Sequence, residues 1–527
     1  MSKKHQVVII GGGPVGLALA LDLGLRGVSC ALIEAATTPH RIPKGQNLTQ
    51  RSMELFYFWG VVDEIRAARI MPSDFPIGEI VAYGDLTSDY WCAPPGRELV
   101  RPYYFQDNER IPQYLVETVL REKLATLSNV DVHAGWSAHA LEQDNRSVRV
   151  SITDAGKEHS EVLEADYAVG CDGARSTIRA LIGIDREGSD FGQLMALVVF
   201  RSTELHAALQ RFPTRSTYRV MHPDLSGYWR FFGRIDIGEG WFFHAPVPPD
   251  STRENFDFKG ELYKAAGFSF ACELDHIGFW DLRVAVAETY HSGRVFIAGD
   301  AAHTHPPYGA FGLNNGLEDA ANLGWKLCAK LNGWGGDGLL NSYSEERRPI
   351  FKETAEDFIA SRIRRDGAFL SRYAPERDRG EFERAWKEWC ADVGFRVKYE
   401  PHYDGSSIIS GPPHGTSSAH GTHAQKARPG HHLAPQMLSN KKNVFEELGA
   451  GLSLLAFDAS DEAIGMFRHA AHEHGLPLKT IRDSGPDMRQ AYEERLILGR
   501  PDHYVAWAGD DPPENVPALL RKITGWD

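Results

Sequence analysis

A glycine-rich segment near the start of the chain has the spacing that binds a dinucleotide phosphate. Gly11, Gly13 and Gly16 follow a short apolar run, and Glu34 follows a second one. In such a segment the first glycine permits a tight turn, the second lets a pyrophosphate approach the backbone, and the third lets helix and strand pack. Free N–H groups at the helix N-terminus attract phosphate, and the acid accepts hydrogen bonds from ribose hydroxyls. These residues predict a dinucleotide site without distinguishing NAD from FAD.

A second carboxylate favours a flavin. Residues 295–298 form an apolar run that ends in Gly299 and Asp300, and a Pro/Gly-rich loop and an amphipathic helical pattern follow. A carboxylate at the end of such a strand can bind a ribityl hydroxyl. The N–H groups near Gly312 and Asn314 can face the electron-rich end of a reduced isoalloxazine. A nicotinamide dehydrogenase has no need of this additional element.

These residues require a parallel sheet whose strands end at one edge. Residues 7–10 have the wholly apolar pattern of a strand buried on both faces, and residues 28–33 predict a second buried strand. Residues 17–25 between them predict a helix. Residues 167–170 predict a further short strand, which ends in the turn Asp172–Gly173. The sequence therefore predicts an α/β fold with a Rossmann-like dinucleotide-binding part.

Two other segments lack this alternation of apolar strands and helices. Residues 76–105 and 185–289 are rich in aromatic residues and glycine, which is typical of short antiparallel strands. We interpret them as a substrate-binding sheet over the flavin. For any one polar or aromatic residue there, a place on the sheet surface or in the core is the commoner role. The candidates for substrate contact are His222, Trp229, Arg234 and His244.

The composition disfavours several classes of partner. The 527 residues carry a formal net charge of −14, which argues against nucleic acid or an anionic membrane surface. The six cysteines are scattered without metal-ligand spacing, so we expect neither a disulfide framework nor a metal site. The sequence shows no signal-peptide core and no membrane-spanning stretch, which indicates a cytoplasmic protein.

The C-terminal part is expected to form a separate unit. Residues 401–430 are rich in Gly, Ser, Pro and His, which is typical of a linker. The histidines around this stretch have no acidic or cysteine partners in a regular pattern, so a loop is favoured over a metal site. Residues 431–527 contain no cysteine and no flavin motif, which excludes thiol–disulfide chemistry and leaves a role in packing or in an oligomer interface, such as that of a homodimer.

The order of the motifs resembles the FAD-dependent aromatic hydroxylases, the class A flavoprotein monooxygenases. The resemblance rests on GGGPVG, residues 11–16, on CDGARSTIR, residues 171–179, and on GDAAHTHPPYGAFGLNNGLEDAANLGWKL, residues 299–327. The last of these is the most specific. The chain is most similar to the larger, phenol-hydroxylase-like members.

The resemblance implies a para-hydroxybenzoate-hydroxylase-like architecture in three parts. A discontinuous FAD-binding domain would be joined by an antiparallel-sheet substrate domain and, after a linker, by a thioredoxin-like domain without redox cysteines. The implied boundaries are 1–75, 106–184 and 290–400 for the FAD-binding domain, 76–105 and 185–289 for the substrate domain, 401–430 for the linker and 431–527 for the thioredoxin-like domain.

The resemblance also implies which residues hold a noncovalent FAD. The first motif would bind the ADP half, Gly299–Asp300 would hold the riboflavin half, and Gln113 would lie beside the ribityl chain. The turn Asp172–Gly173 would serve both FAD and a transient NADPH or NADH. The implied cofactor-binding residues are Gly11, Gly13, Pro14, Val15, Gly16, Glu34, Lys44, Gln113, Asp172, Gly173, Gly299, Asp300, Pro307, Gly309, Gly312, Leu313 and Asn314.

Three positions depart from the family pattern. Lys44 stands where relatives carry an arginine, Ala310 where they carry a second glycine, and Leu313 where they carry a methionine. At Lys44 a guanidinium that can fork or stack is replaced by a point charge. These differences change the expected loop contacts but not flavin binding.

The implied reaction is NAD(P)H- and O₂-dependent hydroxylation of a phenolic substrate through a flavin C4a-hydroperoxide. The cofactor carries the chemistry, while the protein orients the substrate and excludes water. No catalytic base is identified, and the candidates near the flavin are Gln46, Asn47, Pro307 and Tyr308. Two alternatives stay open: epoxidation or Baeyer–Villiger-type insertion on a polycyclic aromatic natural product, and a flavoprotein oxidase that does not hydroxylate.

Overall fold

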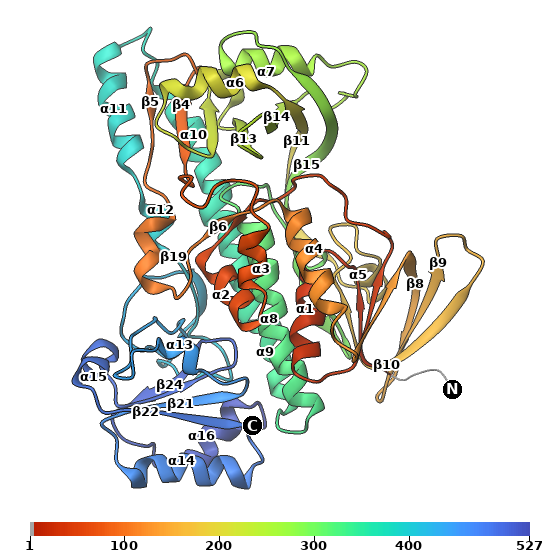
Figure 1. Ribbon diagram of the computed structural model, residues 1–527, viewed down its shortest axis with the longest axis vertical. Coiled ribbons are helices and arrows are strands. Elements are labelled where there is room, and N and C mark those ends of the chain that lie inside the picture. Colours follow the sequence, from red (N-terminus) through yellow and green to blue (C-terminus); the bar gives the residue numbers. More distant parts are fainter. Residues whose placement is uncertain (1–4) are drawn as a thin grey trace.

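The structure of the protein, a computed structural model, describes residues 5–527 (Figure 1). A largely antiparallel sheet, built mainly from residues 186–287, lies at the top of the view, and the C-terminal part, drawn in blue, lies at the bottom. Between them lie the N-terminal segments and two long helices, α8 (Phe311–Leu331) and α9 (Asp337–Glu353). No helix among residues 5–527 is both long enough and apolar enough to cross a membrane.

The first large sheet is the predicted dinucleotide-binding sheet. Its order is β16-β17-β10-β1-β2-β7, and β8 and β9 extend it beside β10. The five strands from β17 to β7 run parallel, and the residues of β1 and β2 are buried on both faces, as their apolar runs predicted. Its strands are β1 (His5–Ile10), β2 (Cys30–Glu34), β7 (Val130–Ala134), β8 (Trp136–Gln143), β9 (Val148–Asp154), β10 (Ser160–Gly170), β16 (His291–Ser292) and β17 (Val295–Ile297).

Helices cover this sheet. Helix α1 (Pro14–Leu25) begins three residues earlier than the predicted helix, with Pro14 at the first helical position, where the missing N–H costs nothing. It packs against α4 (Gln113–Leu124) and α8. The turn after β10 leads into α5 (Thr177–Leu181). Helices α2 (Gln50–Phe58) and α3 (Val62–Ala67) follow the short pairing of β3 (Asn47–Leu48) with β6 (Glu109–Arg110).

The second large sheet confirms the predicted antiparallel strands, and its role in binding substrate stays a prediction. Its order is β18-β15-β11-β14-β13-β12-β4-β5, and every pair is antiparallel except β12 with β4. Its elements are β4 (Glu79–Tyr83), β5 (Trp91–Cys92), β11 (Arg186–Arg201), β12 (Thr217–Met221), β13 (Arg230–Arg234), β14 (Gly240–Val247), β15 (Glu273–Ala287) and β18 (His303–Thr304), with helices α6 (Thr203–Ala208) and α7 (Phe258–Ala266).

A chain of helices lines the open edge of the second sheet. Helix α9 continues through a π-helical segment, Thr354–Ala360, into α10 (Ser361–Arg372). Helices α11 (Arg379–Ala391) and α12 (Gly394–Val397) then lead into β19 (Tyr399–Tyr403). Phe369 of α10 and Phe382 of α11 pack in one cluster with Val81 and Tyr83 of β4. Helix α11 therefore lies beside strands from the first hundred residues (Figure 1).

The C-terminal part holds a four-stranded sheet with the order β22-β21-β23-β24. Strands β21 and β22 are parallel, and the other two pairs are antiparallel. Its thioredoxin-like identity stays a prediction. The elements are α13 (Val444–Glu447), β21 (Leu452–Phe457), α14 (Asp461–Glu473), β22 (Leu478–Asp483), α15 (Pro486–Tyr492), β23 (Leu496–Gly499), β24 (Val505–Gly509) and α16 (Val516–Ile523).

Residues 401–430 do not form an open linker. They contain most of a two-stranded sheet, in which β19 pairs with β20 (Ser417–His420). Tyr403, Ile408 and Ile409 are buried in a core cluster shared with the C-terminal sheet. The glycines of this stretch allow close backbone contacts, since a Cβ on Gly415 would lie 2.4 Å from the Asp404 carbonyl oxygen. The expected linker is therefore a packed connection.

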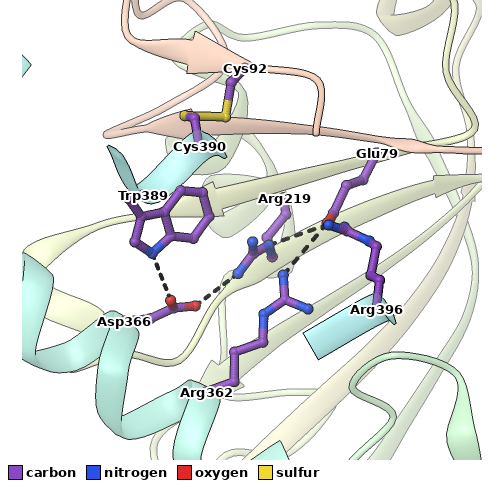
Figure 2. The surroundings of a disulfide bond; sticks show 8 residues. All are labelled: Glu79, Cys92, Arg219, Arg362, Asp366, Trp389, Cys390 and Arg396. Carbon is purple, nitrogen blue, oxygen red and sulfur yellow. Dashed lines mark hydrogen bonds and ion pairs between the residues drawn. A yellow bond between two sulfur atoms is a disulfide. The ribbon is translucent and has the colours of Figure 1, made fainter. Parts of the chain in front are cut away.

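Cys92 of β5 and Cys390 of α11 form a disulfide (Figure 2), so the expectation of no disulfide was wrong. The two residues are 298 positions apart in the sequence, and their Cα atoms lie 6.2 Å apart. Nothing in the local sequence around either cysteine indicates the pairing, because only folding brings β5 and α11 together. The cysteine pattern consequently does not argue for a reducing compartment.

Candidate active site

A cavity of about 870 Å³ lies between the carboxyl ends of the parallel strands, the start of α8 and the second sheet. This is the crevice in which open α/β sheets bind ligands. It brings together most of the predicted site residues. Those that line it are Gly13, Pro14, Val15, Glu34, Lys44, Gln46, Asn47, Gln113, Gly173, Trp229, His244, Asp300, Pro307, Tyr308, Gly309, Gly312, Leu313 and Asn314.

The glycine loop has the shape of a phosphate cradle. Gly11 has φ +107°, and a Cβ there would lie 2.2 Å from the Cys171 carbonyl oxygen, so a side chain is excluded. A Cβ on Gly16 would lie 1.9 Å from the Gly11 carbonyl oxygen. Gly13, by contrast, has open space around it and precedes α1 without a side-chain cap. The loop thus packs tightly on one side and presents the α1 N-terminus to the cavity on the other.

Glu34 is held in place at the end of β2. Its two carboxylate oxygens accept backbone hydrogen bonds, one from Gly12 N–H at 2.5 Å and one from Ala36 N–H at 2.7 Å. Each carboxylate oxygen has a second lone pair, so the group can still accept from a ribose hydroxyl. The geometry fits the predicted role.

Asp300 faces the cavity just after β17. Gly299 N–H donates to Asp319 Oδ2 at 3.0 Å, and the fully buried Asp319 is in turn held by His303 at 2.6 Å and Arg347 at 2.8 Å. This network positions the turn that carries Asp300. Desolvation by the surrounding protein raises the pKa of the Asp300 carboxyl, although His303 and Lys44 oppose the shift. The Asp300 side chain remains exposed to the cavity, where the hydroxyl groups of a ribityl chain could donate to it.

The N-terminus of α8 also points at the cavity. Ala310 caps it in the left-handed conformation, with φ +58° and no side-chain cap. The side chain of Asn314 is used within the protein, because it accepts from Thr49 N–H at 2.9 Å and donates to the Asn47 carbonyl at 2.9 Å. The backbone N–H groups near Gly312 therefore remain available for a flavin ring.

One face of α4 supplies a cation that the sequence analysis missed. Gln113, Glu117 and Arg121 are spaced four residues apart and all line the cavity. Gln113 Nε2 donates to Glu117 Oε1 at 2.8 Å, and Arg121 Nη2 donates to the Gly12 carbonyl at 2.8 Å. The guanidinium thus lies beside the glycine loop, where it can bind a pyrophosphate. The four-residue spacing was the signal that could have identified it.

The segment before α2 places two amides at the cavity wall. Gln46 is only 6 % exposed, and neither polar atom of its side chain has a hydrogen-bond partner among the described residues. Asn47 Oδ1 accepts from Arg110 Nη1 at 2.9 Å. A buried amide without partners costs free energy, so Gln46 is suited to a ligand that supplies both a donor and an acceptor.

Arg110 is a second residue that the sequence analysis missed. It is 4 % exposed, lines the cavity and donates to Asn47 and, at 2.9 Å, to the Arg234 carbonyl. Among the described residues no carboxylate forms an ion pair with it, and burial lowers its pKa to about 9. It therefore places a positive charge in the wall at neutral pH.

Two of the predicted residues at the cavity, His244 and Tyr308, have side chains whose protonation state at pH 7 follows from their burial. Burial lowers the pKa of His244 to about 4, so its imidazole is neutral at pH 7. The Tyr308 hydroxyl donates to Asp366 Oδ2 at 2.9 Å and accepts from Arg219 at 2.9 Å, and burial raises its pKa. Neither residue supplies a strong base near neutral pH. The Trp229 ring packs edge-on against Tyr308, with 3.9 Å between the centroids.

Six predicted residues do not line the cavity: the glycines Gly11, Gly16 and Gly299, and three residues with polar side chains. The Asp172 carboxylate instead caps the start of α5, accepting from Ser176 Oγ at 2.5 Å and from the N–H groups of the next two residues. Arg234 donates to Tyr218 and lies over the Trp241 ring, within the core of the second sheet. His222 accepts from Asp224 N–H at 3.1 Å at a surface turn. These three predictions of ligand contact have no support in the geometry.

The C-terminal part contributes to the cavity wall, contrary to the expectation that it serves packing or assembly only. Tyr504 and His432 both line the cavity. Tyr504 donates to Glu318 Oε2 at 3.2 Å, and His432 lies 2.9 Å from Glu54. The site is therefore built by segments from both ends of the chain.

The histidines of this region do have acidic partners in space, which the sequence analysis did not foresee. His402, Asp404 and His431 have potential ligand atoms within 4.8 Å of one another. However, the two imidazole rings are stacked, with centroids 4.5 Å apart and planes 15° apart, so one metal cannot lie in both ring planes. Although burial opposes it, Asp404 and Glu400 raise the pKa of His431. We therefore describe the cluster as His431 in ion pairs with Glu400 and Asp404.

Replacing Asp300 with alanine is expected to raise the dissociation constant of FAD by about 5- to 150-fold, because a hydrogen bond to a charged group that the bound cofactor covers is worth about 1–3 kcal/mol. Equilibrium titration of the apoprotein with FAD measures this. Asp300→Asn is the matched control, since it keeps an acceptor at the same place and is expected to lose less. Equal FAD affinity in Asp300→Ala and the unmodified protein would show that Asp300 is only a turn residue.

Comparison with known proteins agrees with this geometry. Residues 4–357 match the family model described as FAD binding domain. The rifampicin monooxygenase of Streptomyces venezuelae is 28% identical over 99% of this chain and 98% of its own length. The 4-methyl-5-nitrocatechol 5-monooxygenase of a Burkholderia species is 27% identical over 98% of this chain and 96% of its own. The structure of the rebeccamycin biosynthetic enzyme RebC with reduced flavin aligns with a TM-score of 0.85 at 30% identity, covering 99% of each chain.

Proposed function

Because this chain belongs to the FAD-dependent monooxygenases, the family whose FAD-binding domain it shares, we propose that it hydroxylates a phenolic aromatic ring with NAD(P)H and O₂. One observation carries the proposal. A single cavity joins the phosphate cradle and the Asp300 edge of the parallel sheet to aromatic side chains of the second sheet. A flavin on the first side would face a ring on the second.

The residues present fit FAD. The α1 N-terminus at Gly13 and the Arg121 guanidinium would face the pyrophosphate, and Glu34 would accept from the ribose. Asp300 would hold the ribityl chain, and the α8 N-terminus would face the isoalloxazine. FAD, when bound, would pass two electrons from NAD(P)H to O₂, so that one oxygen atom is added to the ring and the other leaves as water.

The aromatic wall would orient the substrate and exclude water. Trp229 and Phe231 from the β13 region and Phe242 from β14 line the cavity. Such a wall binds a planar ring and keeps water from the reacting atoms, which limits unproductive loss of the activated oxygen. The names of the relatives, which act on rifampicin and on a nitrocatechol, favour an oxygenated aromatic ring as the substrate.

Arg110 would favour the phenolate form of the substrate. Neither His244 nor Tyr308 is a strong base at neutral pH. A buried cation without a carboxylate partner lowers the free energy of a nearby anion, so Arg110 would make a phenol easier to ionise without itself taking the proton. An ionised phenol is richer in electrons and reacts more readily with electrophilic oxygen.

NAD(P)H would reach the flavin only transiently. The glycine motif at residues 11–16 is the dinucleotide motif that FAD would occupy, and the sequence holds no second one. The exposed Lys44 lines the cavity, and its charge partly offsets the rise that burial causes in the pKa of Asp300 and of Glu117. Lys44 and the segment after it would line the entry for the nicotinamide.

We expect NAD(P)H oxidation to be slow in the absence of substrate and to rise at least about tenfold with the correct phenol. A tenfold change corresponds to about 1.4 kcal/mol in the barrier of reduction. The measurement is NAD(P)H consumption across a panel of phenols, with mass analysis of the products and assay of H₂O₂. Hydroxylated product and consumed NAD(P)H should appear in near-equal amounts. Fast consumption that no phenol stimulates and that yields only H₂O₂ would instead indicate an oxidase, and an epoxide or ring-expanded product would indicate the second alternative.

A further inference from the structure

Three arginines gather around one glutamate at the end of the cavity beside the second sheet (Figure 2). Arg219 comes from β12, Arg362 from α10 and Arg396 from α12. Their guanidinium groups lie 3.4, 3.5 and 2.5 Å, respectively, from the carboxylate of Glu79 on β4. We call these four residues the arginine cluster. All four line the cavity.

The cluster has a surplus positive charge. Arg219 also pairs with Asp366 at 2.9 Å, and Arg365 lies 3.9 Å from Asp366 and pairs with Asp392. Four guanidinium groups thus face three carboxylates, and one positive charge is left over. Asp366 Oδ1 also accepts a hydrogen bond from Trp389 Nε1 at 3.0 Å. Although burial opposes ionisation, the three arginines lower the pKa of Glu79 to about 2. Burial lowers the pKa of Arg396 to about 10, which still leaves it charged at pH 7. The surplus therefore persists throughout the neutral pH range.

Hydrogen-bond donors in the cluster are unused. Arg219 is 2 % exposed and Arg362 8 %, and among the described residues Arg219 Nη2 and Arg362 Nε have no hydrogen-bond partner. The Arg362 guanidinium lies over two rings, 4.9 Å from the Tyr308 centroid and 4.1 Å from the Phe395 centroid. Burying an unpaired positive charge and unpaired donors between aromatic rings costs free energy, and a bound anion would offset this cost.

We propose that the arginine cluster binds a carboxylate of the aromatic substrate, at a position away from the ring edge that is hydroxylated. The inference rests on the proposed function, because it assigns the substrate of the same cavity to the aromatic acids. A guanidinium fork matches the geometry of a carboxylate. Trp229, Phe231 and Phe395 beside the cluster suit a planar ring rather than a sugar phosphate, which argues against the phosphates of NADPH as the anion.

The test compares hydroxynaphthoates with the matching hydroxynaphthamides on the oxidised, FAD-loaded protein. Binding is read from the change in flavin absorbance without NAD(P)H, so turnover is not needed. Arg396→Gln brings the net charge of the cluster and Asp366 from +1 to zero and is expected to raise the dissociation constant of the acid about 10- to 100-fold. The amide, which lacks the charge, should change by less than about twofold.

Glu79→Gln is expected to have the opposite effect, because it removes a negative charge and should tighten binding of the acid. Arg364→Gln is the matched control: it removes the same charge from α10, but Arg364 is exposed and pairs with Glu356 at 2.7 Å. FAD content and circular dichroism establish that each variant is folded. If Glu79→Gln does not fold, Arg362→Gln serves as the second variant and should weaken the acid as Arg396→Gln does.

Three results would overturn the inference: no hydroxynaphthoate binds the unmodified protein, acid and amide weaken equally in Arg396→Gln, or that variant weakens NADPH instead of the acid. The two proposals fail separately. Cluster-dependent binding of the acid without any hydroxylated product would leave the arginine cluster as an anion site and reject the proposed hydroxylation. Hydroxylation of neutral phenols, with no effect of Arg396→Gln on binding of the acid, would support the proposed hydroxylation and reject the arginine cluster as a carboxylate site.

Discussion

Replacement of Arg500 with methionine is expected to lower the free energy of unfolding by about 3–5 kcal/mol, because it leaves a buried negative charge without its partner. Arg500 has a fully buried side chain and follows β23. It donates to Glu346 at 2.6 and 2.9 Å and to Asp502 at 2.6 and 2.9 Å, while Lys326 donates to Glu346 at 2.7 Å. Two cations thus balance two carboxylates, and methionine leaves Lys326 alone against both.

The measurement for Arg500→Met is equilibrium urea unfolding, followed by circular dichroism and by release of FAD. Because Tyr504 of the same segment lines the cavity, FAD should be lost in the same transition. Arg489→Met is the control, since Arg489 lies on the surface and pairs with Asp510 at 2.8 Å, which predicts a change below about 1 kcal/mol. Equal stability of the two variants would mean that the C-terminal part is not held to the FAD-binding part by this network.

Gly11→Ala and Gly13→Ala are expected to fail in different ways. A Cβ at Gly11 would lie 2.2 Å from the Cys171 carbonyl oxygen at φ +107°, so the ends of β1 and β10 cannot keep their spacing. We expect little folded Gly11→Ala protein. A Cβ at Gly13 would meet no atom of the described residues within 4 Å, so Gly13→Ala should fold normally. Its methyl group would occupy the space for the pyrophosphate, and FAD binding should weaken by at least about tenfold.

Soluble yield, thermal unfolding and FAD titration distinguish the two glycine variants. Gly465→Ala in α14 is the control, because that glycine also has open space and a helical backbone, and alanine there should leave stability equal or higher by up to about 1 kcal/mol. Normal FAD affinity in folded Gly13→Ala protein would contradict the placement of the pyrophosphate at this loop. A stable, FAD-loaded Gly11→Ala protein would contradict the described turn.

The sequence alone determined the cofactor half of the site. Gly11 and Gly13 are local features, whose spacing is read along a single turn, and Glu34 and Asp300 each end an apolar strand. Parallel strands in one sheet bring their carboxyl ends to one edge, so the residues that follow those strands must meet there. Because of this rule, the positions of these residues along the chain were enough to predict that they lie close together, and the FAD site was inferred from that prediction.

Only the tertiary structure decided the other half. Arg110, the arginine cluster and the Cys92–Cys390 disulfide join segments that are far apart in the sequence. Charged residues and cysteines carry no local pattern that names their partner, because pairing depends on the distance after folding. The same reason explains Asp172, whose carboxylate was predicted at a ligand but caps α5, a role that the sequence permitted equally.

The C-terminal part shows where composition misled. Glycine, serine and proline between residues 401 and 430 were interpreted as signs of an open linker, but Gly415 packs against the Asp404 backbone and Tyr403 is buried. Small residues allow both flexible chain and close backbone contact, and composition does not separate the two. In the fold, Ser406 bonds to Glu346 and Tyr403 packs on Tyr504. This segment is packed because apolar and ion-paired groups from the middle and the C-terminal part of the chain are removed from water together.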